Sequence, residues 1–378
     1  MKILVAMDSF KGSMTSADAA EAVKKGILSA DPFAEVCICP LADGGEGTVD
    51  ALLSIDEKAY AVGIWASDPL GKPHFCQYGV LGNGTAVIEV AETAGLTLIP
   101  KEKRDPMMTT TYGVGEMIRD AINRGHRDFM IGLGGSGTND GGLGMLRALG
   151  WMFQDRNGEP IPHGAIGLKD LAVIDGSNVM PELSQCRFTV ICDVANPLTG
   201  ELGCSAVFGP QKGAGPEGIL AMDQWMRAYG QLVQRHFPTA DPNAAGMGAA
   251  GGLGFAVSAF LGGKIESGAE LIGRYHSMEE KIASCDLIIT GEGSFDGQTA
   301  MGKGPMYIAR LGKVRRKPVI VLAGSLGDGI ENGTLEEITA CFSILPRPMT
   351  LAEAMDPANA RKNLTQTVSG IMRLIQNI

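Results

Sequence analysis

Glycine, acidic, hydroxyl and lysine side chains gather directly after several short apolar runs of this 378-residue chain. Asp8 and Lys11 follow the run KILVAM, Asp193 follows RFTVIC, and Lys212 stands between glycines further along. Phosphoryl transfer needs such groups, because lysines and backbone N–H groups neutralise phosphates while carboxylates bind magnesium or orient the attacking hydroxyl group. The eight cysteines and five histidines show no spacing typical of a metal site. These loops therefore favour a phosphotransferase.

The apolar runs alternate with helical patterns, which predicts a parallel sheet. Residues 2–7 and 34–40 read as buried strands, and residues 58–65 as a third strand. Thr15 begins a capping pattern with Asp18 at the start of a helix between the first two strands. In open parallel sheets, ligands bind outside the carboxyl ends of the strands. We therefore expect the polar loops to lie at one edge.

The pattern changes after residue 68, where residues 72–90 resemble a hairpin, and the α/β alternation returns near residue 285. We expect an α/β domain built from residues 1–65 and 285–378, and a second α/β domain inserted at 66–284. The active site is expected in the crevice between them. Asp356 and Pro357 predict the start of a last, amphipathic helix. Further helices are predicted at 112–124, 140–149, 218–235, 249–261 and 269–283, and further strands at 128–133, 187–192, 285–290, 318–323 and 340–344.

The strand ends supply the candidates for the chemical step. Asp193 is predicted to accept the proton of the attacking hydroxyl group, because it directly follows a buried strand that holds it rigidly. Asp8 is its rival, since it also ends a strand. Lys11 and Lys212 are predicted to neutralise the transferring phosphoryl group or a substrate carboxylate.

Phosphates and metal are assigned to the glycine-rich loops. Lys303 stands beside a predicted helix that opens at Gly304, and a helix N-terminus with a lysine is suited to anions. The other predicted ATP- and phosphate-binding residues are Ser9, Gly134, Gly135, Ser136, Thr138, Gly291, Gly293 and Thr299. The predicted substrate-binding residues are Asn139, Asp140 and Asn196. The predicted magnesium ligands are Asp43, Glu46 and Asp296, since magnesium prefers carboxylate oxygen atoms and water.

Two other functions stay open at this point. Residues 132–137 fit the pattern G-x-G-x-x-G after a strand, which suits an NAD(P)-dependent oxidoreductase. However, the polar segment 138–141 follows where that pattern requires close packing of helix against strand. A non-catalytic sugar-acid-binding protein is the other alternative, although capture of an anion gains nothing from so many carboxylates beside the lysines.

Composition excludes several classes of protein. The net charge is −10 and there is no basic stripe, which argues against nucleic-acid binding. The apolar runs are far shorter than the roughly 18 residues that a membrane span needs. No secretory signal is visible at the start of the chain, so we expect a cytoplasmic protein with reduced cysteines. The oligomeric state stays open, with a homodimer as one alternative.

Several blocks, in order along nearly the whole chain, resemble the bacterial glycerate kinases that phosphorylate D-glycerate with ATP. They are KILVAMDSFKGSMTSADAA (2–20), LADGGEGTVDA (41–51), GLGGSGTNDGGLGM (132–145), CDVANPLTGE (192–201), FGPQKGA (208–214), GAAGGLG (248–254) and TGEGSFDGQTAMGKGP (290–305).

The resemblance implies a Rossmann-like domain formed by both termini with an inserted α/β domain. It also implies ATP with Mg²⁺, and a place in glyoxylate or sugar-acid breakdown. Met7, Gly137 and Glu201 depart from the family pattern, but none of them removes a polar group assigned above. The product is expected to be phosphoglycerate, with the 2-phosphate favoured and the 3-phosphate as the alternative.

Overall fold

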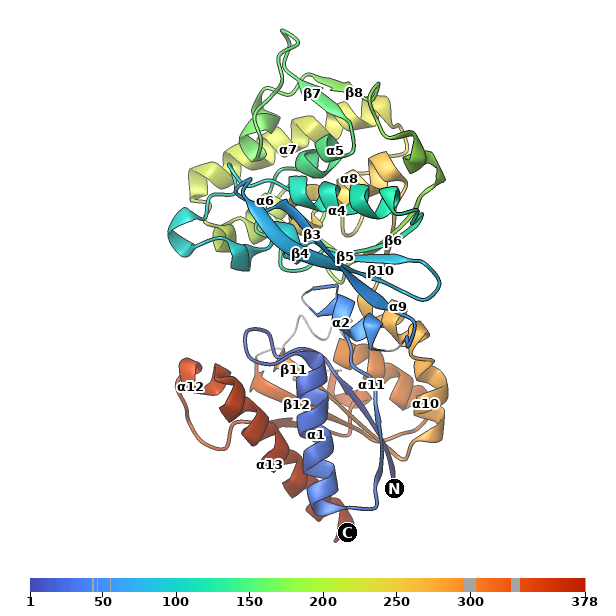
Figure 1. The fold of residues 1–378 in the computed structure, drawn as a ribbon. Coiled ribbons are helices and arrows are strands. Elements are labelled where there is room, and N and C mark those ends of the chain that lie inside the picture. The colour runs from blue at the N-terminus through green and yellow to red at the C-terminus, as the bar shows by residue number, and fades with distance from the viewer. Residues whose placement is uncertain (43, 46, 55, 296–303, 328–333, 378) are drawn as a thin grey trace. The chain divides into compact units, whose positions relative to one another are not determined.

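The chain divides into two compact units in the computed structural model, which describes residues 1–378 except 43, 46, 55, 296–303, 328–333 and 378. Unit 1 consists of Met1–Asp43 and Gly268–Ile378, and unit 2 of Gly44–Ser267 (Figure 1). These boundaries differ from the expected ones at 65 and 285. Strand β3 (Tyr60–Ser67) pairs with a strand of unit 2, whereas the two helices before residue 285 belong to unit 1.

Unit 1 is a five-stranded parallel sheet in the order β13-β12-β11-β1-β2. Its strands are β1 (Lys2–Met7), β2 (Glu35–Ile38), β11 (Leu287–Phe295), β12 (Val319–Leu326) and β13 (Ala340–Ser343). Its α-helices are α1 (Ser16–Ala30), α9 (Gly268–Tyr275), α10 (Met278–Ser284), α11 (Gly304–Val314), α12 (Leu351–Met355) and α13 (Pro357–Gln376).

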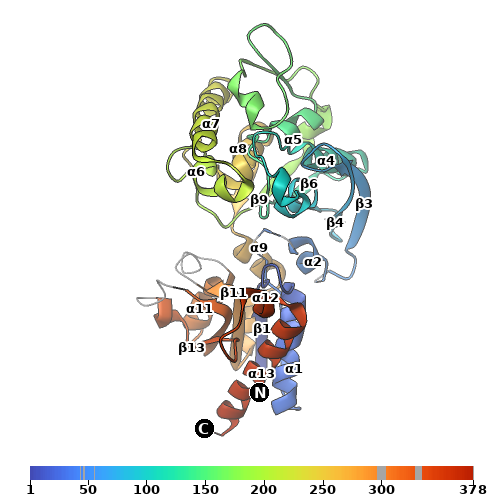
Figure 2. The same cartoon turned by 90° about the vertical axis from the view of Figure 1, so that its left-hand side faces the viewer.

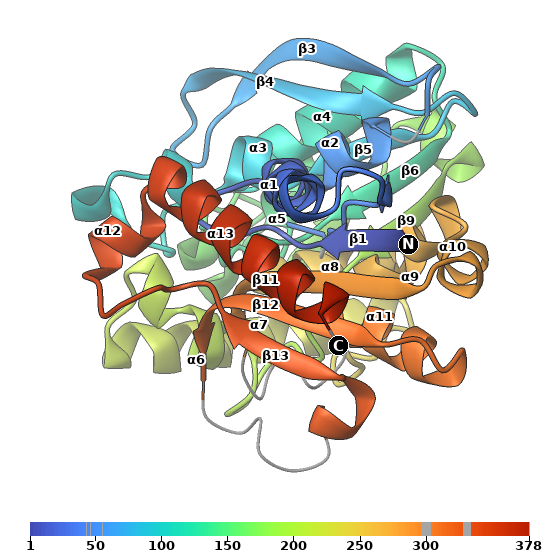
Figure 3. The same cartoon turned by 90° about the horizontal axis from the view of Figure 1, so that it is seen from below.

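Helices cover both faces of this sheet. Alternate residues of β1 point to opposite faces: Val5 joins a core cluster with α1 and α13, and Leu4 joins one with α10 and α11. Figure 3 shows α1 and α13 side by side, where the Thr365 hydroxyl group donates to the Ala22 carbonyl group at 3.0 Å. The sheet is therefore buried on both faces, as its apolar strands predict.

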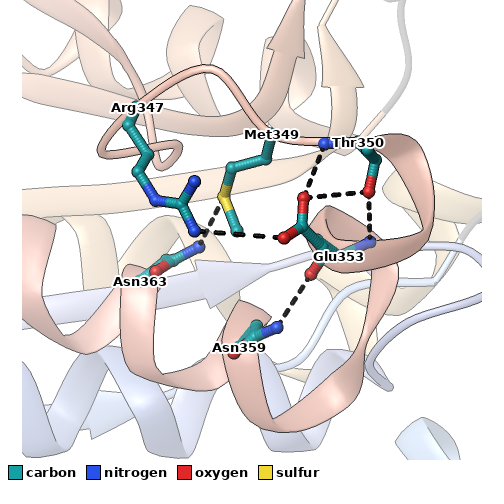
Figure 4. Close-up of polar contacts among 6 residues, drawn as sticks. All are labelled: Arg347, Met349, Thr350, Glu353, Asn359 and Asn363. Atoms are coloured by element: carbon teal, nitrogen blue, oxygen red, sulfur yellow. Dashed lines mark hydrogen bonds and ion pairs between the residues drawn. The ribbon is translucent and has the colours of Figure 1, made fainter.

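Local capping signals place several helix starts of unit 1. The Thr15 hydroxyl group accepts the Asp18 N–H at the start of α1, and the Asp356 carboxylate accepts the Asn359 N–H at the start of α13. Both predicted caps are confirmed. A further capping box, formed by Thr350 and Glu353, begins α12 (Figure 4).

The single helix predicted over 269–283 is wrong. Two helices, α9 and α10, occupy this stretch, and Ser277 interrupts it in the left-handed backbone region with φ of 49°. Apolar periodicity continues across the break, so the pattern alone could not reveal it.

Unit 2 contains a six-stranded mixed sheet in the order β10-β9-β6-β5-β4-β3. The first four of these strands run parallel, whereas β4 pairs antiparallel with both β5 and β3. The strands besides β3 are β4 (Pro73–Val80), β5 (Ala86–Glu89), β6 (Asp128–Gly132), β9 (Arg187–Ile191) and β10 (Lys264–Glu266), with a separate hairpin of β7 (Met152–Gln154) and β8 (Val173–Asp175). The predicted hairpin over 72–90 is confirmed, whereas the placing of 58–65 in the first parallel sheet is wrong.

The helices of unit 2 enclose one large hydrophobic core. They are α2 (Thr48–Leu53), α3 (Ala91–Ala94), α4 (Tyr112–Asn123), α5 (Leu143–Ala148), α6 (Cys204–Phe208), α7 (Pro216–His236) and α8 (Ala249–Leu261). Figure 2 shows the long α7 with α6 and α8 close by. The 3₁₀ helices are Leu96–Leu98, Lys101–Lys103, Ala165–Lys169, Pro181–Gln185 and Pro210–Lys212 in unit 2, and Thr334–Glu337 in unit 1.

Among the described residues, no helix combines the length and the apolar character that crossing a membrane requires.

Candidate functional site

In unit 1, predicted site residues meet at the carboxyl ends of β1 and β11. Asp8 follows β1, is 4% exposed, and accepts the Ser9 N–H at 2.6 Å through Oδ1. Its own N–H donates to the Gly291 carbonyl group at 2.9 Å. Lys11 lies on the exposed loop that follows. The parallel pairing of β1 with β11 thus brings two distant sequence clusters together, as expected from the topology.

Two glycines of this edge neighbour Lys11 and Asp8. A Cβ atom added to Gly293 would lie 3.4 Å from the backbone nitrogen atom of Lys11. A Cβ atom added to Gly304 would lie 3.5 Å from Asp8 Oδ2. Gly304 is the first residue of α11, an 11-residue helix, and the N–H groups at the start of a helix favour negative charge. The Asp8 carboxylate therefore lies beside the start of a helix.

Five predicted site residues lie outside the described residues. They are Asp43, Glu46, Asp296, Thr299 and Lys303. Their assignments to metal and phosphate remain predictions, and the described residues contain no group of three or more histidine, cysteine, aspartate or glutamate side chains arranged to hold a metal ion.

In unit 2, Gly44 lies against the ends of β6 and β9. The Gly134 N–H donates to the Gly44 carbonyl group at 2.9 Å. A Cβ atom on Gly132 would lie 2.5 Å from Gly44 O, and one on Gly44 would lie 2.5 Å from Ile191 O. Real Cβ atoms essentially never come so close to a backbone atom, so these positions admit only glycine without displacement. Backbone packing against backbone thus explains Gly44, Gly132 and Gly134.

Lys212 is buried against the loop that follows β6 and is 2% exposed. Its ammonium group donates to the Thr138 carbonyl oxygen at 2.7 Å and to Ser136 Oγ at 3.1 Å. Burial lowers the pKa of Lys212 to about 8, and Cys204 and Asp140 oppose this shift. Both acceptors are neutral, and no ion pair of Lys212 is found among the described residues.

Two polar atoms next to this contact have no hydrogen-bond partner in the described part of the chain. They are the buried Thr138 Oγ1 and Asn139 Oδ1. The other end of the Asn139 amide donates to Ser205 Oγ at 2.9 Å. Unsatisfied buried polar groups are costly, so the cluster is suited to receive a polar ligand beside the Lys212 ammonium group.

Asp140, a predicted substrate-binding residue, accepts several hydrogen bonds from the chain itself. Its side chain is fully buried, and its oxygen atoms accept the Thr111 N–H at 2.9 Å, the Thr111 hydroxyl group, the Gly142 N–H at 3.0 Å and the Gly144 N–H at 3.1 Å. The donors of the chain itself therefore occupy the carboxylate. These hydrogen bonds hold the loop before α5, and the predicted contact of Asp140 with substrate stays a prediction.

Asp193 follows β9 and is half-buried. Its Oδ1 atom accepts the Ser267 hydroxyl group at 2.9 Å, which orients the carboxylate. Asn196, three residues on, donates through Nδ2 to the Leu202 carbonyl group at 2.8 Å, so this part of its side chain is engaged in shaping the loop. The predicted roles of both residues stay predictions.

Sequence reasoning missed Glu89, the last residue of β5. Glu89 is 5% exposed and accepts the Val49 N–H at 2.6 Å. Burial raises the pKa of its carboxyl group to about 7, against the hydrogen bonds from Val49 and Gly47. Glu89 also lines a cavity of about 400 Å³ in unit 2. The sequence signal that could have revealed Glu89 is an acidic residue directly after the apolar run AVI.

The dinucleotide pattern at 132–137 does not have the geometry of a dinucleotide site. The Gly137 N–H donates to the Ala94 carbonyl group at 2.8 Å, and the helix that follows the glycines begins only at Leu143. A dinucleotide-binding loop would place the N-terminus of a helix directly after the glycines.

The chain is similar to known proteins over its full length. A sequence model described as the glycerate kinase family matches residues 3–376. Glycerate 2-kinase of Escherichia coli is 42% identical over 99% of each chain, and glycerate kinase of Halalkalibacterium halodurans is 43% identical over 95% of this chain and 94% of its own. A crystal structure from Salmonella typhimurium LT2, of a protein provisionally named glycerate kinase 2, has a TM-score of 0.84 and 41% identity. It covers 100% of this chain and 98% of its own.

Proposed function

The chain belongs to the glycerate kinase family of phosphotransferases, and from this premise we propose that it transfers the γ-phosphoryl group of ATP to D-glycerate. The favoured acceptor is the 2-hydroxyl group, in line with the name of the E. coli relative. Membership of a kinase family implies ATP as the phosphoryl donor.

The observation that carries the proposal is the buried Lys212. A cation held by two neutral oxygen acceptors, out of water, attracts an anion strongly because the local dielectric constant is low. Glycerate brings a carboxylate, and ATP brings phosphates. The unpartnered Thr138 Oγ1 and Asn139 Oδ1 can serve the hydroxyl or carboxylate groups of glycerate.

The chemical step assigned to unit 2 is removal of one proton. The 2-hydroxyl oxygen of glycerate attacks the γ-phosphorus atom, its O–H proton passes to the Asp193 carboxylate, and the bond from the γ-phosphorus to the β,γ-bridging oxygen breaks. ADP leaves with that electron pair. The hydrogen bond from Ser267 holds Asp193 for this role, and such orientation supplies much of the catalysis in phosphoryl transfer.

Phosphate binding is assigned to the edge of unit 1. The first turn of α11, which begins at Gly304, offers N–H groups, and the exposed Lys11 adds a positive charge. Ser9, Gly291 and Gly293 border this edge. The Asp8 carboxylate would repel phosphates that approach this edge. A positive charge is therefore needed there, and Lys11 or a metal ion can provide it.

Magnesium is part of the proposal through Asp43, Glu46 and Asp296. These carboxylates have the hard oxygen atoms that Mg²⁺ prefers. Bound there, Mg²⁺ would neutralise charge on the phosphates. No step above depends on it.

The two alternatives have less support. Kinase family membership and the late start of α5 speak against an NAD(P)-dependent oxidoreductase. A non-catalytic sugar-acid-binding protein would not need the carboxylate that Ser267 orients.

Identification of the product tests the proposal. The purified protein is incubated with D-glycerate, ATP and MgCl₂, and the product is examined by ³¹P NMR and by coupling to enolase. We expect a product that enolase consumes without a phosphoglycerate mutase. A product that requires the mutase would move the acceptor to the 3-hydroxyl group, and the absence of any phosphorylated glycerate would refute the proposal.

A further inference from the structure

Glu89 joins two parts of unit 2 that are distant in the sequence. Its carboxylate, at the end of β5, accepts the N–H groups of Val49, at 2.6 Å, and of Gly47. Val49 lies in the first turn of α2, and Gly47 is the residue before that helix. The carboxylate therefore satisfies N–H groups that a helix start leaves without partners.

The residues held by Glu89 follow Gly44, which lies against the ends of β6 and β9. Gly44 accepts the Gly134 N–H at 2.9 Å, and Thr48 closes the segment by donating its hydroxyl group to the Gly45 carbonyl group at 2.7 Å. A side chain on Gly134 would collide with the backbone of Gly45. Glu89 thus holds Gly47–Val49 and Gly134 holds Gly44, beside the loop that contains Ser136.

Burial of a carboxylate at this position is costly. Glu89 is 5% exposed, and its neighbours Glu92 and Asp50 are acidic as well. The described residues provide no ion pair for it. Uncompensated buried charges destabilise a fold, and the hydrogen bonds from the start of α2 offset part of this cost.

We propose that Glu89 is a positioning residue for phosphoryl transfer, which acts by fixing Gly47–Val49, and through them Gly44 and Gly45, against the ends of β6 and β9. The inference rests on the proposed function. Glu89 itself does not touch the reacting atoms in this proposal. Its effect passes through backbone N–H groups, so an uncharged acceptor of the same length can replace it.

Three variants separate the hydrogen bonds from the charge. Glu89→Gln keeps an acceptor oxygen at the same reach, Glu89→Ala removes it, and Asp50→Asn removes a neighbouring exposed carboxylate that has no described hydrogen bond to this segment. We expect kcat to fall about 10- to 100-fold in Glu89→Ala, with the KM for ATP changed less than threefold. Glu89→Gln and Asp50→Asn are expected to stay within about threefold of the parent.

A stability control excludes general damage to the fold. Phe153 in β7 is 2% exposed and belongs to the core of unit 2, so Phe153→Leu should lower the unfolding midpoint without altering kcat. Should Glu89→Ala fail to fold, Glu89→Asp replaces it, because the shorter side chain draws the carboxylate away from the Val49 N–H.

Hydrogen exchange provides a readout that does not depend on activity. Amides of residues 44–53 should exchange faster in Glu89→Ala than in the parent, and at the parent rate in Glu89→Gln. Unchanged exchange in Glu89→Ala, or an equal loss of kcat in the Gln and Ala variants, would overturn the positioning role. If the parent phosphorylates no glycerate, the proposed function fails while the exchange measurement still tests the position of the segment.

Discussion

At the scale of single residues, phosphoryl transfer needs a positive charge out of water and an oriented carboxylate. In our proposal Lys212 supplies the first and Asp193 the second. Each is held by a described hydrogen bond at the carboxyl edge of unit 2. Low local dielectric makes the lysine charge effective and also makes it easier to lose. The pH dependence of the reaction should therefore report on Lys212.

We predict that kcat/KM falls as the pH rises through about 8. Burial lowers the pKa of Lys212 to about 8, so the ammonium group is charged below this pH and neutral above it. Because kcat/KM reports groups of the free enzyme, it should be measured with D-glycerate from pH 6.5 to 10. In Lys212→Arg, whose guanidinium group stays charged, the decline should move to higher pH. A parent profile that stays flat up to pH 10 would contradict the assignment.

A second prediction concerns the base. Asp193→Asn keeps the size of the side chain and an acceptor for Ser267, but it removes the charge that accepts the proton. We expect kcat to fall by about two to four orders of magnitude, the range for a general base, while the Kd for ATP measured by calorimetry stays close to that of the parent.

Ser267→Ala is the matched control for Asp193. It removes the orienting hydrogen bond and leaves the carboxylate, so its loss of kcat should be much smaller. Near-normal kcat in Asp193→Asn would eliminate this residue, and a selective loss in Asp8→Asn would transfer the role to Asp8.

At the scale of elements, the residues proposed for the chemistry lie in loops at strand ends, and tight backbone contacts determine where these loops lie. The Gly44 contact with Gly134 and the Asp140 contacts with Thr111 both join segments that are far apart in the chain. Outside these loops, Ser277 between α9 and α10 has a left-handed backbone conformation, which a side chain disfavours.

Replacement of Ser277 by glycine should stabilise the protein. Ser277 has φ of 49° and is exposed, and a side chain in this left-handed region costs roughly 1 kcal/mol, whereas glycine adopts it freely. We expect a small rise in the urea midpoint of unfolding for Ser277→Gly and none for Ser277→Ala, which keeps the Cβ atom. Equal midpoints in the parent and the glycine variant would show that the turn is not strained.

The metal assignment is a prediction about two strand-end loops. Asp43→Asn and Asp296→Asn each remove a candidate oxygen charge for Mg²⁺, so both variants should need a higher Mg²⁺ concentration for half-maximal rate at saturating ATP. Asp50→Asn serves as the control outside the assigned set. If both variants titrate with Mg²⁺ as the parent does, magnesium binds elsewhere.

At the scale of the whole molecule, each unit has hydrophobic cores of its own. Two clusters flank the parallel sheet of unit 1, and one large cluster fills unit 2. Units with separate cores often unfold separately, and the two-state description then fails.

We therefore predict a calorimetric unfolding enthalpy larger than the van't Hoff enthalpy. Leu364 in α13 and Leu149 after α5 are fully buried in unit 1 and unit 2, respectively, and truncation of either to alanine should cost about 2–5 kcal/mol. Each variant should shift a different part of the thermogram. A single transition that both variants shift equally would mean that the units unfold as one.

The sequence by itself determined the features that depend on neighbouring residues. Helix starts at Thr15 and Asp356 follow from side chains that cap N–H groups three residues away, and buried strands follow from short apolar runs. The polar loops after those strands, together with several blocks in family order, were enough to predict an α/β glycerate kinase.

Only the tertiary structure decided the features that depend on distant contacts. Apolar alternation in 58–65 indicates a strand but not its partner, and pairing with β4 places it in unit 2. Nothing local distinguishes Asp140, which the chain's own donors occupy, from Asp193, or predicts that Glu89 would hold the start of α2. Burial and hydrogen-bond partners distinguish these carboxylates, and both arise from segments that meet only when the chain folds.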